Sequence, residues 1–343
     1  MNYILTGVRG FIASEIARQL LKDPSNTVWG VDDDSKGYGD RNLLDIINNP
    51  KLKIFKIDIS KPTEDELFLL DGLISMSDYV ISAASKIGGI GYFNKIPATI
   101  IRDNNLINTT LLDLIVASTK RPRFVYLSSS MVYEAAVSFP SRETDLETTF
   151  IPKTAYGMSK LCGEYFCKAY AKQYGLHYTI VRPFNAIGPE RPDPNMVGFS
   201  HVLPDLVLKI HNGQGTEHNP LEILGTGDQV RHYTHVRDIA DGILTCIHSA
   251  GSLNNDFNIS TPYGHSVKDL ALILWDKFRE KELKTLNKTD KKTLYCKSVQ
   301  GFDADVQNRV PDTSKMYKHF GWQAKYTLED SAEEVIDAVI KLL

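Results

Sequence analysis

A tyrosine and a lysine at positions 156 and 160 form the pair whose spacing most directly suggests chemistry. The segment Tyr156-Gly-Met-Ser-Lys160 opens a helical pattern that runs to Tyr174. Residues four apart on a helix share one face, so the ammonium group would lie near the phenol. That ammonium group, together with a positive nicotinamide ring, would favour the phenolate and lower a pKa that is normally about 10. Tyr156 is therefore a candidate general base, although the same spacing also occurs on exposed amphipathic helices.

Three serines supply a further hydroxyl group for the same chemistry. Ser128, Ser129 and Ser130 end the apolar run that begins at Phe124, which we expect to be the fifth strand. A hydroxyl group there could hydrogen-bond the oxygen that Tyr156 deprotonates. The set predicts an oxidation in which Tyr156 takes a hydroxyl proton while a carbon-bound hydride leaves for a nicotinamide ring.

Glycines near the N-terminus indicate where a nicotinamide cofactor would bind. A predicted strand at 3–6 runs into a turn with Gly7 and Gly10, and a helical pattern follows that contains Phe11 and Ile12. Glycines let the backbone approach a pyrophosphate, and the helix N-terminus supplies N–H donors and a partial positive charge. The spacing is G-x-x-G-x-x-A, which also fits an ordinary tight connection between strand and helix.

Acidic residues after the second predicted strand favour NAD over NADP. The run at 27–31 ends in Val31-Asp32-Asp33-Asp34. A carboxylate at this position can accept both hydroxyl groups of an adenosine ribose and repels a 2′-phosphate. We assign this role to Asp32, with Asp33 as a second candidate, and expect the three acids to outweigh the nearby Arg9.

Three further residues at strand ends are assigned to the cofactor site. Asp58 closes the third predicted strand and is followed by Ile59. A contact with the adenine and simple helix capping remain alternatives for Asp58. Ala83 follows the fourth predicted strand and completes the set.

Alternating strand and helix patterns place these residues in one fold. Helical patterns, notably 98–118 and 156–174, lie between apolar runs at 3–6, 27–31, 53–57, 78–82, 124–128 and 178–181. Such alternation predicts βαβ units and a parallel sheet. The sequence therefore predicts an α/β protein with a Rossmann-type doubly wound parallel sheet, whose ligands bind at the carboxyl ends of the strands.

The chain changes character after Arg182. Prolines crowd the stretch 183–194, and strand-like runs at 221–224 and 231–236 precede a helix at about 237–248. The run 256–259 is expected to return to the main sheet. We therefore expect a cofactor domain and a smaller, interleaved C-terminal substrate domain, made respectively of 1–181 with about 237–260, and of 182–236 with 261–343.

Composition limits the classes of protein that remain. The 343 residues include 39 Lys+Arg and 42 Asp+Glu, a formal charge of −3 that argues against nucleic-acid binding. No apolar run reaches the roughly 18 residues of a membrane span. Four scattered cysteines and the lack of a signal pattern predict a reducing cytoplasm. We expect no metal site, because His232 and His235 lie three apart on a strand-like stretch and so face opposite sides.

Taken together, the motifs resemble the extended short-chain dehydrogenase/reductase family over essentially the whole chain. The matching elements are TGxxGFIA, the acid after the second strand, SSSMVY and YGMSK. Later segments that carry Asn185, Arg231 and Arg309 resemble the family's binding segments for a sugar diphosphate. Members oxidise C4 of nucleotide-activated sugars with bound NAD and then epimerise, dehydrate, decarboxylate or reduce them.

The resemblance implies a role for each matching residue. Tyr156 would be the base, Lys160 would orient the cofactor ribose and tune Tyr156, and Ser129 would support the reacting oxygen. Arginine suits the diphosphate because its planar fork matches phosphate oxygens. The substrate-binding residues implied are Lys86, Ser130, Asn185, His201, Val202, Arg231 and Arg309, with a cofactor contact as an alternative for Lys86.

The residue two positions after Ser129 favours a 4-epimerase within this family. Dehydratases and decarboxylating members resemble this region but carry acids there, and GDP-fucose synthase and GDP-mannose 3,5-epimerase carry a cysteine. Ser130 and Met131 supply neither group. We therefore expect an NAD-dependent epimerase that inverts C4 of a UDP- or GDP-sugar, similar in type to UDP-glucose 4-epimerase.

Two alternatives remain. Lys86-Ile-Gly-Gly-Ile90 and Ser200-His201-Val-Leu-Pro204 resemble GDP-fucose synthase, in which the matching histidine is a general acid. A substrate contact is the competing role for His201, and an epimerase/reductase would consume NADPH. The other alternative is a non-catalytic NAD-binding regulatory protein on the same fold.

Surplus apolar residues on two helices suggest a homodimer. The stretch 98–118 includes Leu106, Leu111, Leu112, Leu114 and Ile115, and that from Tyr156 includes Leu161, Tyr165, Phe166 and Tyr170. A helix face that packs only against one sheet needs fewer apolar residues than these helices carry. A two-fold four-helix interface, common in this family, would bury the excess, and the alternative is a broad contact inside one chain.

Overall fold

A seven-stranded parallel sheet forms the centre of the protein in the computed structural model, which describes residues 1–35, 37, 39–88, 95–149, 151–189, 202–286, 293–300 and 308–340. The strand order is β11-β6-β5-β4-β1-β2-β3. The strands are β1 (Asn2–Thr6), β2 (Thr27–Asp32), β3 (Leu52–Lys56), β4 (Tyr79–Ser82), β5 (Arg123–Leu127), β6 (Tyr178–Pro183) and β11 (Asn255–Ile259). This confirms the predicted doubly wound α/β fold, including the return of the run at 256–259 to the main sheet.

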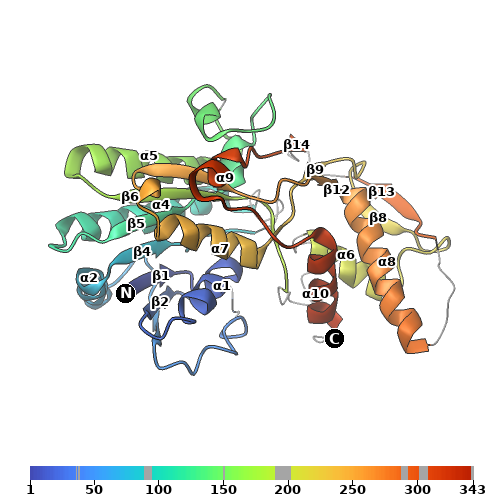
Figure 1. Ribbon diagram of the computed structural model, residues 1–343, viewed down its shortest axis with the longest axis horizontal. Coiled ribbons are helices and arrows are strands. Elements are labelled where there is room, and N and C mark those ends of the chain that lie inside the picture. Colours follow the sequence, from blue (N-terminus) through green and yellow to red (C-terminus); the bar gives the residue numbers. More distant parts are fainter. Residues whose placement is uncertain are drawn as a thin grey trace.

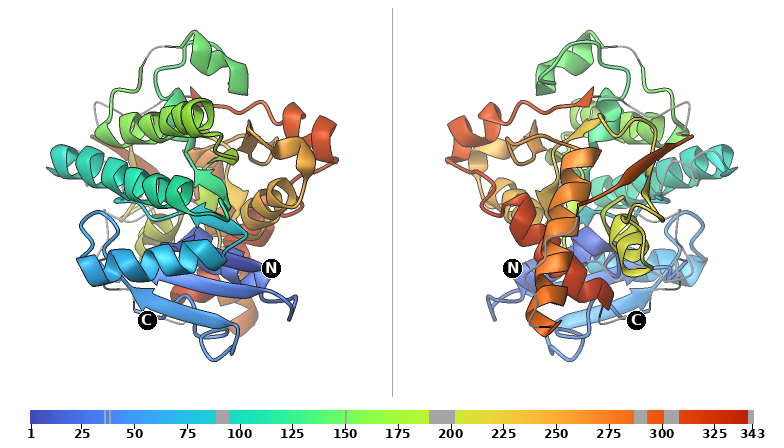
Figure 2. Two further views of the ribbon diagram at one scale, coloured as in Figure 1. Left: turned by 90° about the vertical axis from the view of Figure 1, so that its left-hand side faces the viewer. Right: turned by 90° about the vertical axis from the view of Figure 1, so that its right-hand side faces the viewer.

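Helices cover both faces of this sheet (Figure 1). One face carries α1 (Phe11–Leu20) and α7 (Val236–Ile247), and the other carries α2 (Glu64–Met76), α4 (Pro97–Ala117) and α5 (Ala155–Tyr174). Along β1, Tyr3 and Leu5 join one apolar cluster whereas Ile4 joins the other. Side chains alternate across a strand, so an apolar run such as this one is buried on both sides. Figure 2 (left) shows the resulting layers, with the light-blue to green helices α2, α4 and α5 on one side and the orange α7 on the other.

The helix that carries Tyr156 and Lys160 has well-defined ends. The side chain of Thr154 accepts a hydrogen bond from the Gly157 backbone N–H, which caps the first turn of α5. Gly175 ends the helix with a φ of 72°, a left-handed conformation that favours glycine. Both ends fix the register of the helix and therefore the direction in which its side chains point.

A second apolar core lies beside the sheet, at the right in Figure 1. It contains α6 (Val202–His211), α8 (Val267–Leu286), α10 (Leu328–Ile340) and β8 (Leu221–Leu224), which pairs with β13 (Cys296–Val299). None of the described helices is long and apolar enough to cross a membrane.

Short strands connect the second core to the sheet. The stretch 231–236, predicted as one strand, is instead divided between β9 (Val230–Arg231) and β10 (Thr234–His235). The two have different partners: β9 lies between β12 (His265–Ser266) and β14 (Asn308–Arg309), whereas β10 pairs with β7 (Ala186–Ile187). The helix α9 (Ser314–Phe320) follows β14.

Close packing between β5 and α5 predicts the effect of adding one methyl group. A Cβ atom at Gly163 of α5 would lie 2.2 Å from Tyr126, whose hydroxyl donates to the Lys160 carbonyl over 3.3 Å. We expect Gly163→Ala to lower the free energy of unfolding by about 1–3 kcal/mol, measured in chemical denaturation. Gly72→Ala in α2 is the matched control, because its Cβ would meet nothing within 4 Å. This control should gain stability, by about 0.5–1 kcal/mol. Equal stabilities of the two variants would contradict the contact.

Candidate active site

The turn between β1 and α1 has the shape expected of a phosphate-binding turn. Gly7 has a φ of 68°, and a Cβ atom there would lie 2.9 Å from the backbone of Ala84. Thr6 Oγ1 accepts hydrogen bonds from the N–H groups of Ala83 and Ala84 at 3.1 and 3.0 Å, which holds the ends of β1 and β4 together. Gly10 precedes α1 and has no side chain to cap it, so the first N–H groups of this helix are directed toward a ligand.

Two predicted cofactor residues lie at the start of α1. Phe11 and Ile12 are its first residues and are partly buried. The tip of the Phe11 ring lies 3.3 Å from the position that a Cβ atom on Gly188 would take. Ile12 packs against the apolar cluster between α1 and α7. Their side chains therefore anchor the helix directly after the glycine turn.

Asp32 lies at the carboxyl end of β2, where an adenosine ribose is expected. Its two oxygens accept hydrogen bonds from the backbone N–H groups of Arg9 at 3.0 Å and Asp34 at 2.8 Å. Burial raises the pKa of Asp32, and these two N–H groups oppose that shift. Each oxygen keeps a second lone pair for a ribose hydroxyl group. Arg9 donates through Nε to Asp40 over 2.9 Å, so its guanidinium is already engaged by an acid.

Lys86 lies with the acids of this turn. Its Nζ donates to Asp33 Oδ2 at 2.9 Å and to Ser35 Oγ at 3.1 Å. Burial opposes ionisation of Asp33, but the Ser35 N–H and Lys86 outweigh it and lower the pKa of this carboxyl. Of the two roles considered for Lys86, a cofactor contact fits this position better than a substrate contact.

The other strand-end residues make local contacts. Asp58 Oδ1 accepts from the N–H of Ser60 at 3.0 Å and from its hydroxyl at 2.6 Å, so this carboxylate stabilises the turn after β3. Ile59 is 4 % exposed and its side chain packs in the apolar cluster on the α2, α4 and α5 side of the sheet. These contacts leave the adenine contact of Asp58 and the cofactor role of Ile59 as predictions.

The structure brings Ser129, Tyr156 and Lys160 together. The Ser129 hydroxyl group lies close enough to the Tyr156 phenol to act on it and lower its pKa. Lys160 Nζ lies 5.8 Å from the centre of the Tyr156 ring and donates to the Leu127 carbonyl over 2.8 Å. Tyr156 and Lys160 are each 4 % exposed, so the cluster is almost completely shielded from water.

This shielding shifts both pKa values toward the neutral forms. Burial raises the pKa of Tyr156 to about 12, although Ser129 and the charge of Arg309 act to lower it. Burial lowers the pKa of Lys160 to about 7, against the opposing charge of Glu164. The predicted lowering of the Tyr156 pKa depends on Lys160 and on a nicotinamide ring together, whereas burial by the protein acts in the opposite direction.

Asn104, on α4, belongs to the site although the sequence did not single it out. Its Oδ1 accepts from the Lys86 N–H at 2.7 Å, and its Nδ2 donates to Ser159 Oγ at 3.0 Å. Ser159 in turn donates to the Tyr156 carbonyl at 2.8 Å. This buried amide therefore ties the segment after β4 to the catalytic helix. No short motif reveals it, since its partners come from distant parts of the chain.

Two arginines and an asparagine face the other side of the site. Arg309 on β14 is paired in register with Arg231 on β9. Arg309 Nη1 donates to Asn185 Oδ1 over 3.3 Å, and the Asn185 backbone carbonyl accepts from Thr234 N–H over 3.1 Å. Strands far apart in the chain thus gather two guanidinium groups, whose charges suit a diphosphate.

The remaining predicted residues are less tightly grouped. Ser130 is 3 % exposed, and Val202 is the first residue of α6 and is 36 % exposed. His201 lies outside the described residues. A cavity of about 190 Å³ lies behind α5, and its lining includes none of the predicted site residues.

The two histidines considered as metal ligands have other partners. His232 Nδ1 lies 2.9 Å from the Thr261 carbonyl oxygen, and His235 stacks on Tyr326 with ring centres 4.3 Å apart. In the part of the chain that the structure describes, no group of three or more His, Cys, Asp or Glu residues could hold a metal ion.

The geometry at the carboxyl end of β2 predicts which cofactor, NAD or NADP, the protein prefers. We expect Asp32→Ala to weaken NAD binding about 10- to 100-fold, because it removes charged acceptors of two hydrogen bonds. Asp40→Ala is the control: it frees Arg9 and should strengthen NADP binding while leaving NAD affinity unchanged. Calorimetric titration of the cofactor-free protein measures both, and unchanged NAD affinity in Asp32→Ala would refute the assignment.

Comparisons with known proteins agree with this geometry. The chain is 25% identical over 283 residues to the probable GDP-L-fucose synthase 1 of Oryza sativa subsp. japonica, covering 81% of this chain and 80% of that protein. It superimposes on UDP-glucose 4-epimerase of Thermotoga maritima, solved with UDP-glucose, with a TM-score of 0.81, 25% identity and 99% of each chain covered. It shares the fold of UDP-glucuronic acid 4-epimerase of Bacillus cereus, solved with UDP-glucuronic acid and NAD, at 23% identity, a TM-score of 0.81 and 100% of each chain. Residues 3–260 match the sequence pattern of one family. The chain therefore belongs to the NAD dependent epimerase/dehydratase family.

Proposed function

We propose that this protein inverts C4 of a nucleotide-diphosphate sugar through a transient 4-keto intermediate. The observation that carries the proposal is the contact between Ser129 and Tyr156, with Lys160 beside them. Tyr156 takes the proton of the C4 hydroxyl group, and Ser129 holds the same oxygen. When bound, NAD supplies the acceptor and donor of the hydride. Return of the hydride to the opposite face of the turned ketosugar then inverts C4 without another acid or base.

The residue beside Tyr156 supports epimerisation over the other reactions of the family. Met131 is 7 % exposed and packs with Tyr156 and Ile100 in a small apolar cluster. A thioether cannot move a proton at C3 or C5. Dehydration and decarboxylation resemble this reaction but need an acid near this position, and fucose synthesis needs a thiol. The simplest reaction that the described site supports is therefore C4 epimerisation.

The two arginines support a substrate with a diphosphate. Arg231 and Arg309 lie side by side on paired strands, and Asn185 contacts Arg309. The similar epimerase of Thermotoga maritima is solved with UDP-glucose. We infer that these three residues bind the diphosphate of a UDP- or GDP-sugar, with Ser130 and Val202 closer to its other parts.

The main alternative is an epimerase/reductase of the GDP-fucose synthase type. The 25% identity to the rice protein favours it. Such an enzyme would consume NADPH, whereas the acids at the end of β2 and the pairing of Arg9 with Asp40 favour NAD. A non-catalytic NAD-binding protein would leave the contact between Ser129 and Tyr156 without a use.

We also propose that two parts of the chain bind different ligands. Residues 1–181 with about 237–260 would bind NAD, and 182–236 with 261–343 would bind the nucleotide sugar. The separate apolar core around α6, α8 and α10 supports this division.

We also propose that the protein works in the cytoplasm. The cysteines are free thiols, which fits this proposal; they are Cys162, Cys167, Cys246 and Cys296.

A panel of UDP-, GDP-, CDP- and dTDP-sugars, with products followed by NMR, tests the function. We expect one C4 epimer pair to interconvert with no net consumption of NADPH, and heat denaturation to release about one NAD per chain. Tyr156→Phe and Ser129→Ala should each lower turnover by about 100-fold or more while NAD stays bound. Near-wild-type turnover of Tyr156→Phe would refute the base, and NADPH consumption with little bound NAD would favour the reductase.

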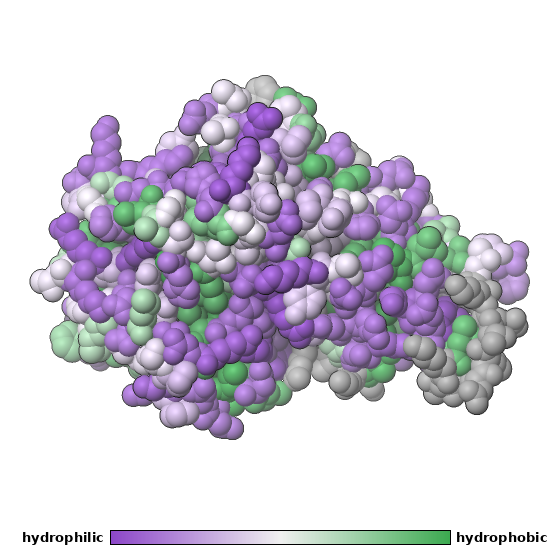
Figure 3. Space-filling model, in the orientation of Figure 1, coloured by the Kyte–Doolittle hydropathy of each residue, from purple (hydrophilic) through white to green (hydrophobic). Residues whose placement is uncertain are grey.

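We further propose a homodimer through α4 and α5. Leu111, Leu112 and Ile115 are completely buried inside the chain, so much of the predicted surplus is intramolecular, but Leu106 and Tyr165 are 41 % and 65 % exposed. Hydrophilic residues predominate on the opposite face, which Figure 3 shows. Light scattering at micromolar concentration should give the dimer mass, and Leu106→Glu with Tyr165→Glu should give the monomer. A monomeric wild-type protein would reject the interface.

A further inference from the structure

Glu164 lies on the catalytic helix one turn after Lys160 and is almost completely buried. Its side chain is 2 % exposed, and its Oε1 accepts a hydrogen bond from Ser128 Oγ at 2.5 Å. Ser128 immediately precedes Ser129. Lys160 makes the neighbouring contact, from Nζ to the Leu127 carbonyl at 2.8 Å. Lys160 and Glu164, one helical turn apart on α5, thus bind Leu127 and Ser128 at the end of β5. These two residues directly precede Ser129.

Arg182, on β6, holds the carboxylate of Glu164. Nε donates to Oε1 at 2.8 Å and Nη2 donates to Oε2 at 2.7 Å, in a planar, two-pronged arrangement. Nη1 donates to the Tyr133 hydroxyl at 2.8 Å. Tyr133 ends the short helical turn η1 (Ser130–Tyr133), for which Ser129 is the N-cap. Arg182 therefore supports the segments on both sides of Ser129, through Glu164 on one side and directly on the other.

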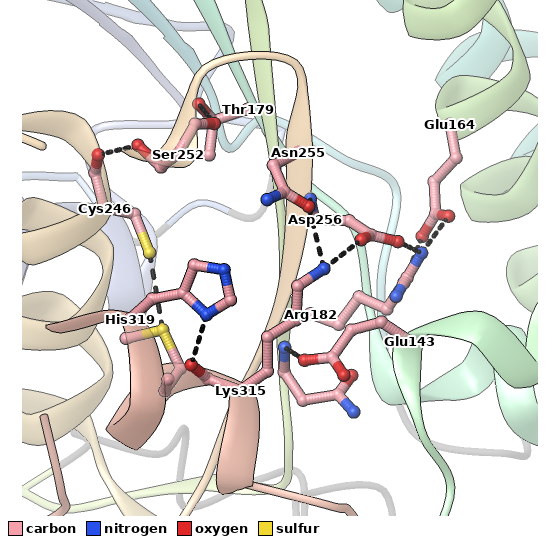
Figure 4. Close-up of polar contacts among 12 residues, drawn as sticks. Glu143, Glu164, Thr179, Arg182, Cys246, Ser252, Asn255, Asp256, Lys315 and His319 are labelled. Atoms are coloured by element: carbon pink, nitrogen blue, oxygen red, sulfur yellow. Dashed lines mark hydrogen bonds and ion pairs between the residues drawn. The ribbon is translucent and has the colours of Figure 1, made fainter. Parts of the chain in front are cut away.

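The far side of Arg182 is held as well. Its Nη2 donates to Asp256 Oδ2 at 2.6 Å, and Lys315 Nζ donates to Asp256 Oδ1 at 2.8 Å. Figure 4 shows these groups in a row, with Glu164 at one end and Lys315 at the other. Lys315 lies in the first turn of α9, the helix that follows Arg309 and β14. The row thus links the catalytic helix with the segment that carries one of the two substrate-facing arginines.

We propose that Glu164 is a positioning residue for Ser129 and Lys160, acting through Ser128 and Arg182. Glu164 does not touch the reacting atoms. Its hydrogen bond fixes the end of β5, and its charge stabilises the charged form of Lys160. The groups that face it are Tyr126 and Ser128 on β5, Tyr133 on η1, Lys160 and Cys167 on α5, Arg182 and Tyr178 on β6, Asp256 on β11, and Glu143.

Three variants and a control separate the hydrogen bond from the charge. Glu164→Gln keeps an oxygen for Ser128 but removes the charge, Glu164→Asp keeps the charge but shortens the side chain, and Ser128→Ala removes only the hydrogen bond. Glu147→Gln removes one charge from an exposed residue on the rim of the cavity behind α5. Each is assayed as holoenzyme, with bound NAD and thermal midpoint measured in parallel.

We expect Glu164→Gln and Ser128→Ala to lower kcat by about 10- to 100-fold with little change in KM or bound NAD. Removing a negative charge makes proton loss from the Tyr156–Lys160 pair easier. Glu164→Gln should therefore also move the pH profile of kcat about one unit to lower pH. Glu164→Asp and Ser128→Ala should keep the wild-type profile, and Glu147→Gln should keep both rate and profile. Wild-type kcat in Ser128→Ala, or a slower Glu164→Gln with an unmoved profile, would overturn the proposal.

The turnover assay depends on the proposed function, so a second measurement uses no sugar. The phenolate of Tyr156 is titrated by ultraviolet absorbance in the holoenzyme, as the difference between each protein and its Tyr156→Phe counterpart. Glu164→Gln should shift this titration to lower pH, whereas Glu147→Gln should not. A shifted titration with no wild-type turnover would refute the epimerase but retain the positioning role. An unshifted titration would refute the positioning role, whatever the sugar panel shows.

Discussion

The arrangement of the site depends on one guanidinium group that has no access to water. Arg182 is completely buried and is surrounded by a carboxylate from α5, a carboxylate from β11 and a phenol from the turn after β5. An intact buried ion pair adds little stability compared with apolar packing, yet removing one partner costs about 3–5 kcal/mol. The group therefore acts mainly by fixing three elements relative to one another. Two of them, α5 and the turn after β5, begin next to Tyr156 and Ser129 respectively.

Burial also explains the protonation of the two central residues. A buried phenol and a buried ammonium each resist their charged forms, which gives pKa values of about 12 for Tyr156 and about 7 for Lys160. Burial therefore favours the protonated phenol of Tyr156 and the uncharged amine of Lys160. The charges that oppose this state, Glu164 near the lysine and Arg309 near the tyrosine, come from different parts of the fold. The electrostatics of the cluster thus depend on elements well outside its short motif.

The features that could be predicted from the sequence are those that depend on the local spacing of residues. Apolar runs predicted the strands of the main sheet to within one or two residues, and the spacing of Tyr156 and Lys160 predicted that both face one site. Contacts between distant segments were not predictable in this way. Neither Asn104 nor Glu164 belongs to a pattern that identifies its partner, and the pairing of Lys86 with Asp33 depends on how two loops meet. The extent to which burial raises the pKa of Tyr156 was not predictable either, because the extent of burial is a property of the packed structure.

The pairing of β9 with β14 has a consequence for the order in which the protein is made. Arg309 emerges from the ribosome long after Ser129, Tyr156 and Lys160, and it reaches its place only when β14 pairs with β9. β11, which supplies Asp256 to the buried arginine, also emerges after the catalytic helix. During synthesis the nascent chain therefore contains Tyr156 before it contains Arg309. The proposed diphosphate site is therefore completed late in synthesis, once β14 has paired with β9.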